Sequence, residues 1–134
     1  MTYKIDFIST KKLIHVENFS KKRVLWLYNK VQKEGVWKKP LIVDKDYFIV
    51  MDGQHRMEVA KILKLDYVPC IMLDYKKVKF YSLRKKYQFN LDEIIQKATN
   101  GNIFPYKTVK HVFDNQSDIK CNFTINELKN LKNV

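Results

Sequence analysis

The sequence predicts a single α+β domain in which short strands and amphipathic helices share one core. The chain has 134 residues, which is near the usual size of one domain. Hydrophobic residues make up 46% of it, and glycine and proline number only three each, so a sizeable core is expected and disordered or collagen-like classes are excluded. Apolar runs of strand length alternate with segments of helical periodicity. No repeat or linker divides residues 1–134, so we expect one domain.

The first half of the chain contains three expected strands and the first helix. Alternating apolar and polar residues over 3–7 predict a strand. Over 19–33, apolar residues recur at helical spacing with lysines on the opposite side, which predicts an amphipathic helix that stops at Gly35. Two short apolar runs, 41–43 and 47–51, flank a polar turn and predict a hairpin.

A strand, a sharp turn and a second helix are expected in the middle of the chain. The run 47–51 leads directly into Asp52–Arg56, and apolar residues over 57–63 follow at helical spacing. The nearly continuous apolar run 67–73 predicts a buried strand, and 78–82 predicts one more.

Two capping boxes mark helix starts in the last third of the chain. Asn90 can cap the free amide groups of the helix that follows, with Glu93 in the reciprocal position, and that helix should end near Ala98. Thr124 and Glu127 form the same pattern and predict a short terminal helix.

The charge and the apolar pattern restrict the partners of the protein. A formal net charge of +12, from 26 basic and 14 acidic residues, favours a polyanionic partner such as a nucleic acid, a nucleotide or an anionic membrane. The basic residues are spread along the chain, so solvated faces are an equally good interpretation. No apolar run reaches the roughly 18 residues of a membrane span, and no signal peptide is visible, so we expect a cytoplasmic protein without a membrane partner.

The segment Asp52–Arg56 is the strongest local signal because it lies at a strand-to-helix junction. A helix start exposes unpaired amide groups and carries a partial positive charge, both of which attract phosphate. Gly53 lets the backbone come close, and His55 and Arg56 add donors that can neutralise phosphate oxygens. Asp52 is suited to holding Mg²⁺ or a substrate hydroxyl. The alternative is that Asp52 only caps the helix and Arg56 lies on the surface.

Glu17 lies at the entrance to the first expected helix. A carboxylate there is most often a favourable charge at a helix N-terminus, worth roughly 0.3 to 1 kcal/mol. In a cleft, the same group can act as a general base.

The segment 104–111 places two lysines, a hydroxyl and an imidazole within five positions: Lys107, Thr108, Lys110 and His111. It is typical of a loop that grips an anion, although a basic surface loop explains it equally well. Trp26 and Trp37 are expected in the core, with stacking on a base as the alternative. No phosphate-binding P-loop, Rossmann fingerprint or nucleophile elbow is present, so the sequence does not support those nucleotide and hydrolase sites.

The order of these residues resembles the ParB/sulfiredoxin fold, a small mixed sheet packed with helices. The resemblance covers about half of the chain. It rests on Glu17, Trp37-x-x-Pro40-Leu41-x-Val43, Asp52-Gly53-Gln54-His55-Arg56-x-x-x-Ala60-x-x-Leu63 and Val68-Pro69.

Further segments are similar to the ParB-like free serine kinases, which extends the resemblance through most of the sequence. They are Asp74-Tyr75, Ser82-x-Arg84 and Gly101-x-x-Phe104-Pro105-x-Lys107-Thr108-x-Lys110-His111. Those kinases often have histidine where Gln54 stands here, and proline, threonine and arginine at the positions of Tyr106, Val109 and Lys110. Lysine in place of arginine lacks the planar fork of donors.

This resemblance implies a kinase that transfers the terminal phosphoryl group of ATP or ADP to the hydroxyl of free L-serine, with Mg²⁺, and gives O-phosphoserine. It implies that Glu17 accepts the serine proton and that Asp52 organises the metal or the hydroxyl. The implied nucleotide-binding residues are Gly53, Gln54, His55 and Arg56. The implied residues that hold the transferred phosphate or the carboxylate of the amino acid are Lys107, Thr108, Lys110 and His111.

The second hypothesis is a non-catalytic nucleotide- or DNA-binding module with the same fold. Two relatives of the fold are disfavoured by the residues: sulfiredoxin chemistry needs a cysteine where Gln54 stands, and chromosome-partitioning ParB proteins typically have Gly-Glu-Arg-Arg in this turn. A carboxylate base at Glu17 has no use in simple DNA binding, which favours the kinase. The sequence does not determine the oligomeric state.

Overall fold

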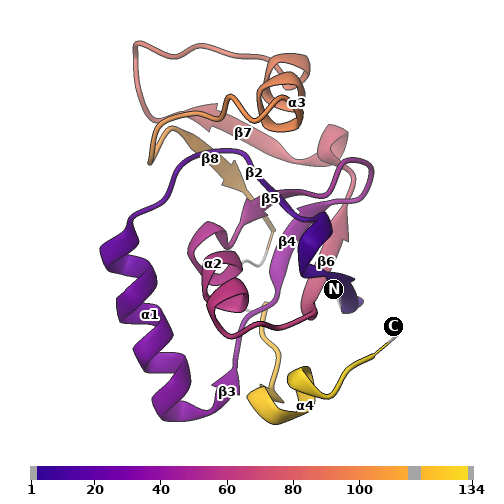
Figure 1. Cartoon of the computed structure of the whole chain (residues 1–134). Helices are drawn as coiled ribbons and strands as arrows, with labels where there is room; N and C mark the ends of the chain where they lie inside the picture. Colours follow the sequence, from indigo (N-terminus) through magenta and orange to yellow (C-terminus); the bar gives the residue numbers. More distant parts are fainter. Residues whose placement is uncertain (1–2, 115–118, 133–134) are drawn as a thin grey trace.

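A five-stranded mixed sheet forms the centre of the fold (Figure 1). The computed structural model describes residues 3–114 and 119–132. The strand order is β1-β6-β4-β5-β2, in which β1 pairs with β6 and β4 with β5 in antiparallel fashion, and β4 with β6 and β2 with β5 in parallel fashion. The strands are β1 (Asp6–Ser9), β2 (Ile14–His15), β4 (Leu41–Asp44), β5 (Ile49–Asp52) and β6 (Tyr67–Leu73). The mixed sheet implied by the resemblance is confirmed.

Helices and two small strand pairs complete the fold. The helices are α1 (Lys21–Glu34), α2 (Gln54–Ile62), α3 (Leu91–Thr99) and α4 (Ile125–Lys129), with 3₁₀ turns at Thr10–Lys12 and Tyr75–Lys77. The pairs are β3 (Val36–Trp37) with β9 (Phe123–Thr124), and β7 (Lys79–Ser82) with β8 (Val109–Val112). Among the described residues, no helix is long and apolar enough to cross a membrane.

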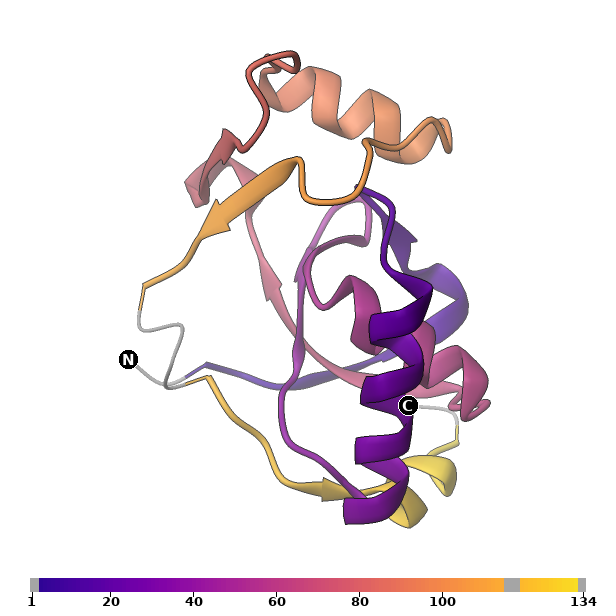
Figure 2. The ribbon, with the colours of Figure 1, turned by 90° about the vertical axis from the view of Figure 1, so that its left-hand side faces the viewer.

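The sheet is covered on both faces, because successive residues of a strand point to opposite sides. In β4, Leu41 and Val43 join a core that includes residues of α1, α2 and α4, whereas Ile42 joins a second core with α3 and β8. In Figure 2, α3 lies above β8 at one end of the molecule, and α4 lies at the other end.

The helix ends agree with the local signals in the sequence. Ser20 caps α1 by accepting the Arg23 N–H at 3.1 Å, and Gly35 ends the helix in the left-handed region, at φ 70°. Both expected capping boxes are present, at the starts of α3 and α4. The predicted hairpin is formed by β4 and β5, and the predicted strand over 67–73 is β6.

Two of the sequence expectations are wrong at strands that pair with distant partners. The first strand covers Asp6–Ser9 instead of 3–7, because its position is fixed by pairing with β6, with Asp6 opposite Cys70. The segment expected as a loop over 104–111 ends in β8, which pairs with β7. Alternation within one strand carries no information on which partner it pairs with.

Candidate active site

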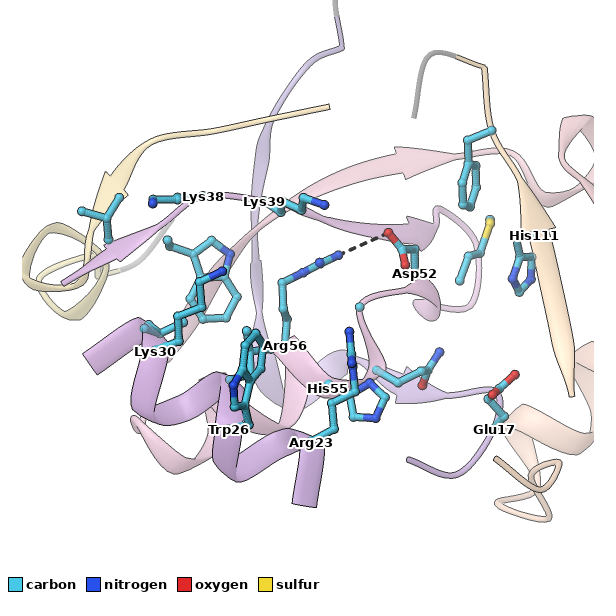
Figure 3. Close-up of a pocket in the computed structure, with 18 of the residues that line it drawn as sticks. Glu17, Arg23, Trp26, Lys30, Lys38, Lys39, Asp52, His55, Arg56 and His111 are labelled. Atoms are coloured by element: carbon cyan, nitrogen blue, oxygen red, sulfur yellow. Dashed lines mark hydrogen bonds and ion pairs between the residues drawn. The ribbon is translucent and has the colours of Figure 1, made fainter. Parts of the chain in front are cut away.

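A cavity of about 490 Å³ lies between α1, the β5–α2 turn and β8 (Figure 3). This volume is within the range of small-molecule sites. Among the described side chains that line it, the cationic ones outnumber the acidic ones and favour an anionic ligand. The cationic residues are Arg23, Lys30, Lys38, Lys39, Arg56 and Lys110, and the acidic residues are Glu17, Glu34 and Asp52.

The cavity brings together most of the residues singled out in the sequence, from segments far apart in the chain. Its walls include Glu17, Asp52, Gly53, Gln54, His55, Arg56, Lys110 and His111. Lys107 and Thr108 are not among the lining residues, although the Lys107 backbone contacts Glu17.

The β5–α2 turn brings backbone close to the cavity. Gly53 has φ 111°, and a Cβ atom there would collide with the Leu41 side chain, so glycine is required. The helix begins at Gln54, and the Met57 N–H donates to the Gly53 carbonyl at 2.8 Å. The backbone N–H groups between Gly53 and Met57 therefore have no acceptor within the helix. These amides and the helix dipole make the turn suited to phosphate.

Asp52 and Arg56 interact across this turn. The Arg56 guanidinium donates to Asp52 Oδ2 at 3.3 Å and to the Pro40 carbonyl at 3.4 Å, and its side chain is only 19% exposed. Gly53 is the N-cap residue of α2, and no side chain in the described part of the chain caps it. The alternative that Asp52 only caps a helix and Arg56 is a surface residue is therefore wrong.

His55 is neutral in this environment. Its Nε2 accepts the Ser20 N–H at 3.1 Å, which places the ring proton on Nδ1. Burial, together with the nearby Arg23 charge, lowers the pKa of His55. His55 can therefore donate a hydrogen bond to a phosphate oxygen, but it does not supply the positive charge that was expected of it, and Arg56 is the cationic residue of this turn.

The side chain of Gln54 is held by hydrogen bonds within the protein. Its amide N–H donates to the Val50 carbonyl at 2.5 Å, and its oxygen lies 2.5 Å from His15 Nδ1. The other ring nitrogen of His15 lies 2.7 Å from Glu58 Oε2. These contacts tie the start of α2 to β2 and β5, so Gln54 fixes the position of the turn.

Glu17 does not lie at the N-terminus of a helix, where the sequence placed it. The helix begins four residues later, at Lys21, and Glu17 is only 8% exposed. Its carboxylate accepts the Lys107 N–H at 2.7 Å and the Val109 N–H at 2.9 Å. Burial raises the pKa of Glu17, and the hydrogen bonds from these backbone amides oppose that rise. The helix-charge interpretation is wrong, and a buried carboxylate faces the cavity instead.

Of the four residues expected to grip an anion, Lys110 is the one that lines the cavity with a cationic side chain. The Thr108 hydroxyl is buried and donates to the Pro105 carbonyl at 2.7 Å. His111 Nε2 lies 2.6 Å from the Tyr75 hydroxyl, and burial lowers the pKa of His111 to about 4, so its ring is neutral. Lys107 contributes its backbone N–H to Glu17.

Several cavity residues were missed by sequence reasoning. The expectation of a core position is confirmed for Trp37, which is 1% exposed, and is wrong for Trp26, which is 58% exposed and lines the cavity. Arg23, Trp26 and Lys30 follow each other at intervals of three and four residues, which places them on one face of α1. The spacing was visible in the sequence, but the cavity that this face borders was not.

Comparisons with known proteins show which sequences and folds this chain is similar to. No protein-family model matches the sequence. Over 72 residues, 51% of the chain, it is 31% identical to the ATP-dependent L-serine kinase of Desulfurococcus mucosus, of which it covers 28%. Over 104 residues, 72% of the chain, it is 27% identical to the ADP-dependent L-serine kinase SerK of Thermococcus kodakarensis, of which it covers 43%.

Among solved structures, a free serine kinase in complex with AMP matches with a TM-score of 0.85 at 14% identity, over 96% of this chain and 95% of that one. The chain has the fold of this free serine kinase. The resemblance found in the sequence is confirmed by these matches. The chain spans less than half the length of the two curated L-serine kinases, at 28% and 43%.

Proposed function

We propose that this chain is a kinase that transfers a phosphoryl group from ATP or ADP to the hydroxyl of free L-serine, giving O-phosphoserine. The observation that carries the proposal is the meeting of Glu17, Asp52 and the start of α2 in one cationic cavity. The L-serine kinases among the sequence relatives support the same substrate class. We also expect the reaction to take place in the cytoplasm.

The start of α2 binds the phosphates of the donor. Phosphoryl transfer depends mainly on positioning and on stabilising charge at the phosphate oxygens. The amides after Gly53 point at the phosphates, His55 donates through Nδ1, and Arg56 and Lys110 supply positive charge. Gln54 holds this turn in place.

Glu17 is the general base. As the serine Oγ forms a bond to the terminal phosphorus, the bond from that phosphorus to the bridging oxygen of the nucleotide breaks, and the serine proton moves to the Glu17 carboxylate. Each carboxylate oxygen of Glu17 accepts one backbone N–H and has a second lone pair for the serine hydroxyl. The two amides fix the direction of the carboxylate, which favours proton transfer in a single orientation.

Asp52 is suited to one Mg²⁺ ion shared with the donor. The described residues include no group of three or more His, Cys, Asp or Glu side chains that could hold a metal by themselves. Mg²⁺ is usually held by one or two carboxylates together with substrate phosphates, and Asp52 is a 40% exposed carboxylate on the cavity wall. When bound, Mg²⁺ neutralises charge on the phosphate oxygens.

The test is incubation of the protein with L-serine, Mg²⁺ and either ATP or ADP, with mass spectrometry for O-phosphoserine. We expect product from the wild type, and a loss of at least about 100-fold in Glu17→Gln, as for removal of a general base. Asp46→Asn is the matched control, because Asp46 is an exposed carboxylate outside the cavity.

Glu17→Gln needs a second measurement, because one of its amide atoms is a donor that would face a backbone N–H. Leaving that buried N–H unpaired costs about 1 to 3 kcal/mol. ADP binding and the melting temperature therefore have to be measured in the same variant. Full turnover in folded Glu17→Gln, or no product from a wild-type sample that binds nucleotide, contradicts the proposal.

A further inference from the structure

Trp26 presents a large aromatic surface to the cavity. Its side chain is 58% exposed, in contrast to Trp37 at 1%. An indole has one of the largest apolar surfaces of any side chain, and leaving it in water forgoes the free energy of burial. Because Trp26 lines the cavity, a ligand in the cavity can cover this surface.

Trp26 lies away from the end of the cavity that would hold the terminal phosphate of the donor. In Figure 3, Glu17 and His111 lie at one end, Lys30 and Lys38 at the other, and Arg56 between them. In the proposed reaction, the terminal phosphate lies near Glu17 and the start of α2. The remainder of the nucleotide must therefore extend past Arg56 toward α1, where Trp26 lies.

The chemistry of this end suits a nucleobase. Every base has a π-face that can stack on an indole, a contact worth about 1 to 3 kcal/mol per base. The Lys30 ammonium lies 5.4 Å from the centre of the Trp26 ring, and a lysine on one face is compatible with a base on the other.

We propose that Trp26 is the stacking platform for the nucleobase of the phosphoryl donor. This inference rests on the proposed function, because it takes the cavity to be a nucleotide site. Stacking tolerates any base, so the platform supplies affinity for nucleoside di- and triphosphates as a class.

The test compares Trp26→Phe with Trp26→Leu, which are both apolar but differ in having a π-face. ADP affinity is measured by isothermal titration calorimetry, and kcat and KM in the serine assay. We expect Trp26→Leu to weaken ADP binding by roughly 5- to 150-fold, as for the loss of one stacked base, with kcat at saturating donor unchanged. Trp26→Phe should keep most of the affinity. Leu25→Ala is the matched control, because Leu25 is equally exposed, at 58%, but does not line the cavity.

Each outcome separates the inference from the proposed function. Equal ADP affinity in Trp26→Leu and Trp26→Phe overturns the stacking role while leaving the kinase proposal intact. A fall in kcat with unchanged KM places Trp26 in the chemical step and also overturns it. A wild-type protein that binds neither ATP nor ADP overturns both proposals together.

Discussion

Glu17 and His111 are buried titratable residues on the cavity wall, and burial shifts their pKa values in opposite directions. Burial raises the pKa of Glu17, and the hydrogen bonds from the Val109 and Lys107 amides offset part of that rise. Burial lowers the pKa of His111 to about 4. In both cases the cause is the loss of water around the charged form. The carboxylate has amide donors to replace that water, whereas His111 is left as a neutral ring.

We expect His111 to make the free energy of unfolding fall as the pH drops from about 6.5 to about 4. The unfolded residue takes up a proton near its ordinary pKa of 6.5, whereas the folded residue does so only near 4, so over this interval protons favour the unfolded state. The contribution of neutral His111 to the free energy of unfolding is fully present above pH 6.5 and is lost as the pH falls through 4. Its size is about 3 kcal/mol.

Urea unfolding of the wild type and of His111→Phe, from about pH 8 down to about pH 4, measures this effect. The variant has no imidazole to protonate, so its stability relative to the wild type should improve as the pH falls. A difference between the two proteins that is independent of pH would show that His111 does not titrate as described.

At the scale of elements, the junction of β5 with α2 depends on one glycine. Gly53 combines φ 111° with a close approach to Leu41, whereas Gly35, at φ 70°, has open space within 4 Å of the point where a Cβ would lie. Both would suffer from the positive φ on substitution by alanine, but only Gly53 would also suffer a collision with its surroundings.

We therefore expect Gly53→Ala to destabilise the protein by about 3 kcal/mol or more, and Gly35→Ala by about 1 kcal/mol. Thermal unfolding followed by circular dichroism gives both values. Because the strain in Gly53→Ala lies at the start of α2, ADP binding should weaken in that variant and stay unchanged in Gly35→Ala. Equal losses of stability at the two positions would count against the close packing at the turn.

Helices were easier to predict than strand pairs, and the reason is physical. The starts of α3 and α4 were predicted from side chains that bond amides three residues away, so the whole signal lies within one turn. The bounds of β1 and β8 depend on pairing with β6 and β7, which are far away in sequence. No local pattern specifies a partner at that separation.

For the whole molecule, the net charge of +12 allows both a nucleotide site and a surface for DNA. The two differ in how many phosphates are contacted. A module that contacts 6 to 10 phosphates loses about 10³- to 10⁵-fold in affinity between about 50 and 200 mM salt. A nucleotide with two or three phosphates in a cavity releases far fewer counterions.

We expect ADP affinity to fall by less than about tenfold over that salt range, and duplex DNA to bind only weakly at its lower end. Calorimetry with ADP and fluorescence anisotropy with a labelled duplex provide the two measurements. Tight duplex binding that falls steeply with salt, without measurable ADP binding, would favour the DNA-binding alternative over the kinase.

The sequence by itself determined the helices, the hairpin, the glycine turn and the set of residues around Asp52–Arg56, because each depends on neighbours within a few positions. Only the tertiary structure decided that Glu17 is held by the amides of Lys107 and Val109, that His111 is buried and neutral, and that Trp26 faces a cavity while Trp37 is in the core. Burial and hydrogen bonding between distant segments set these properties. They arise only when the chain is folded, and a linear pattern of residue types does not contain them.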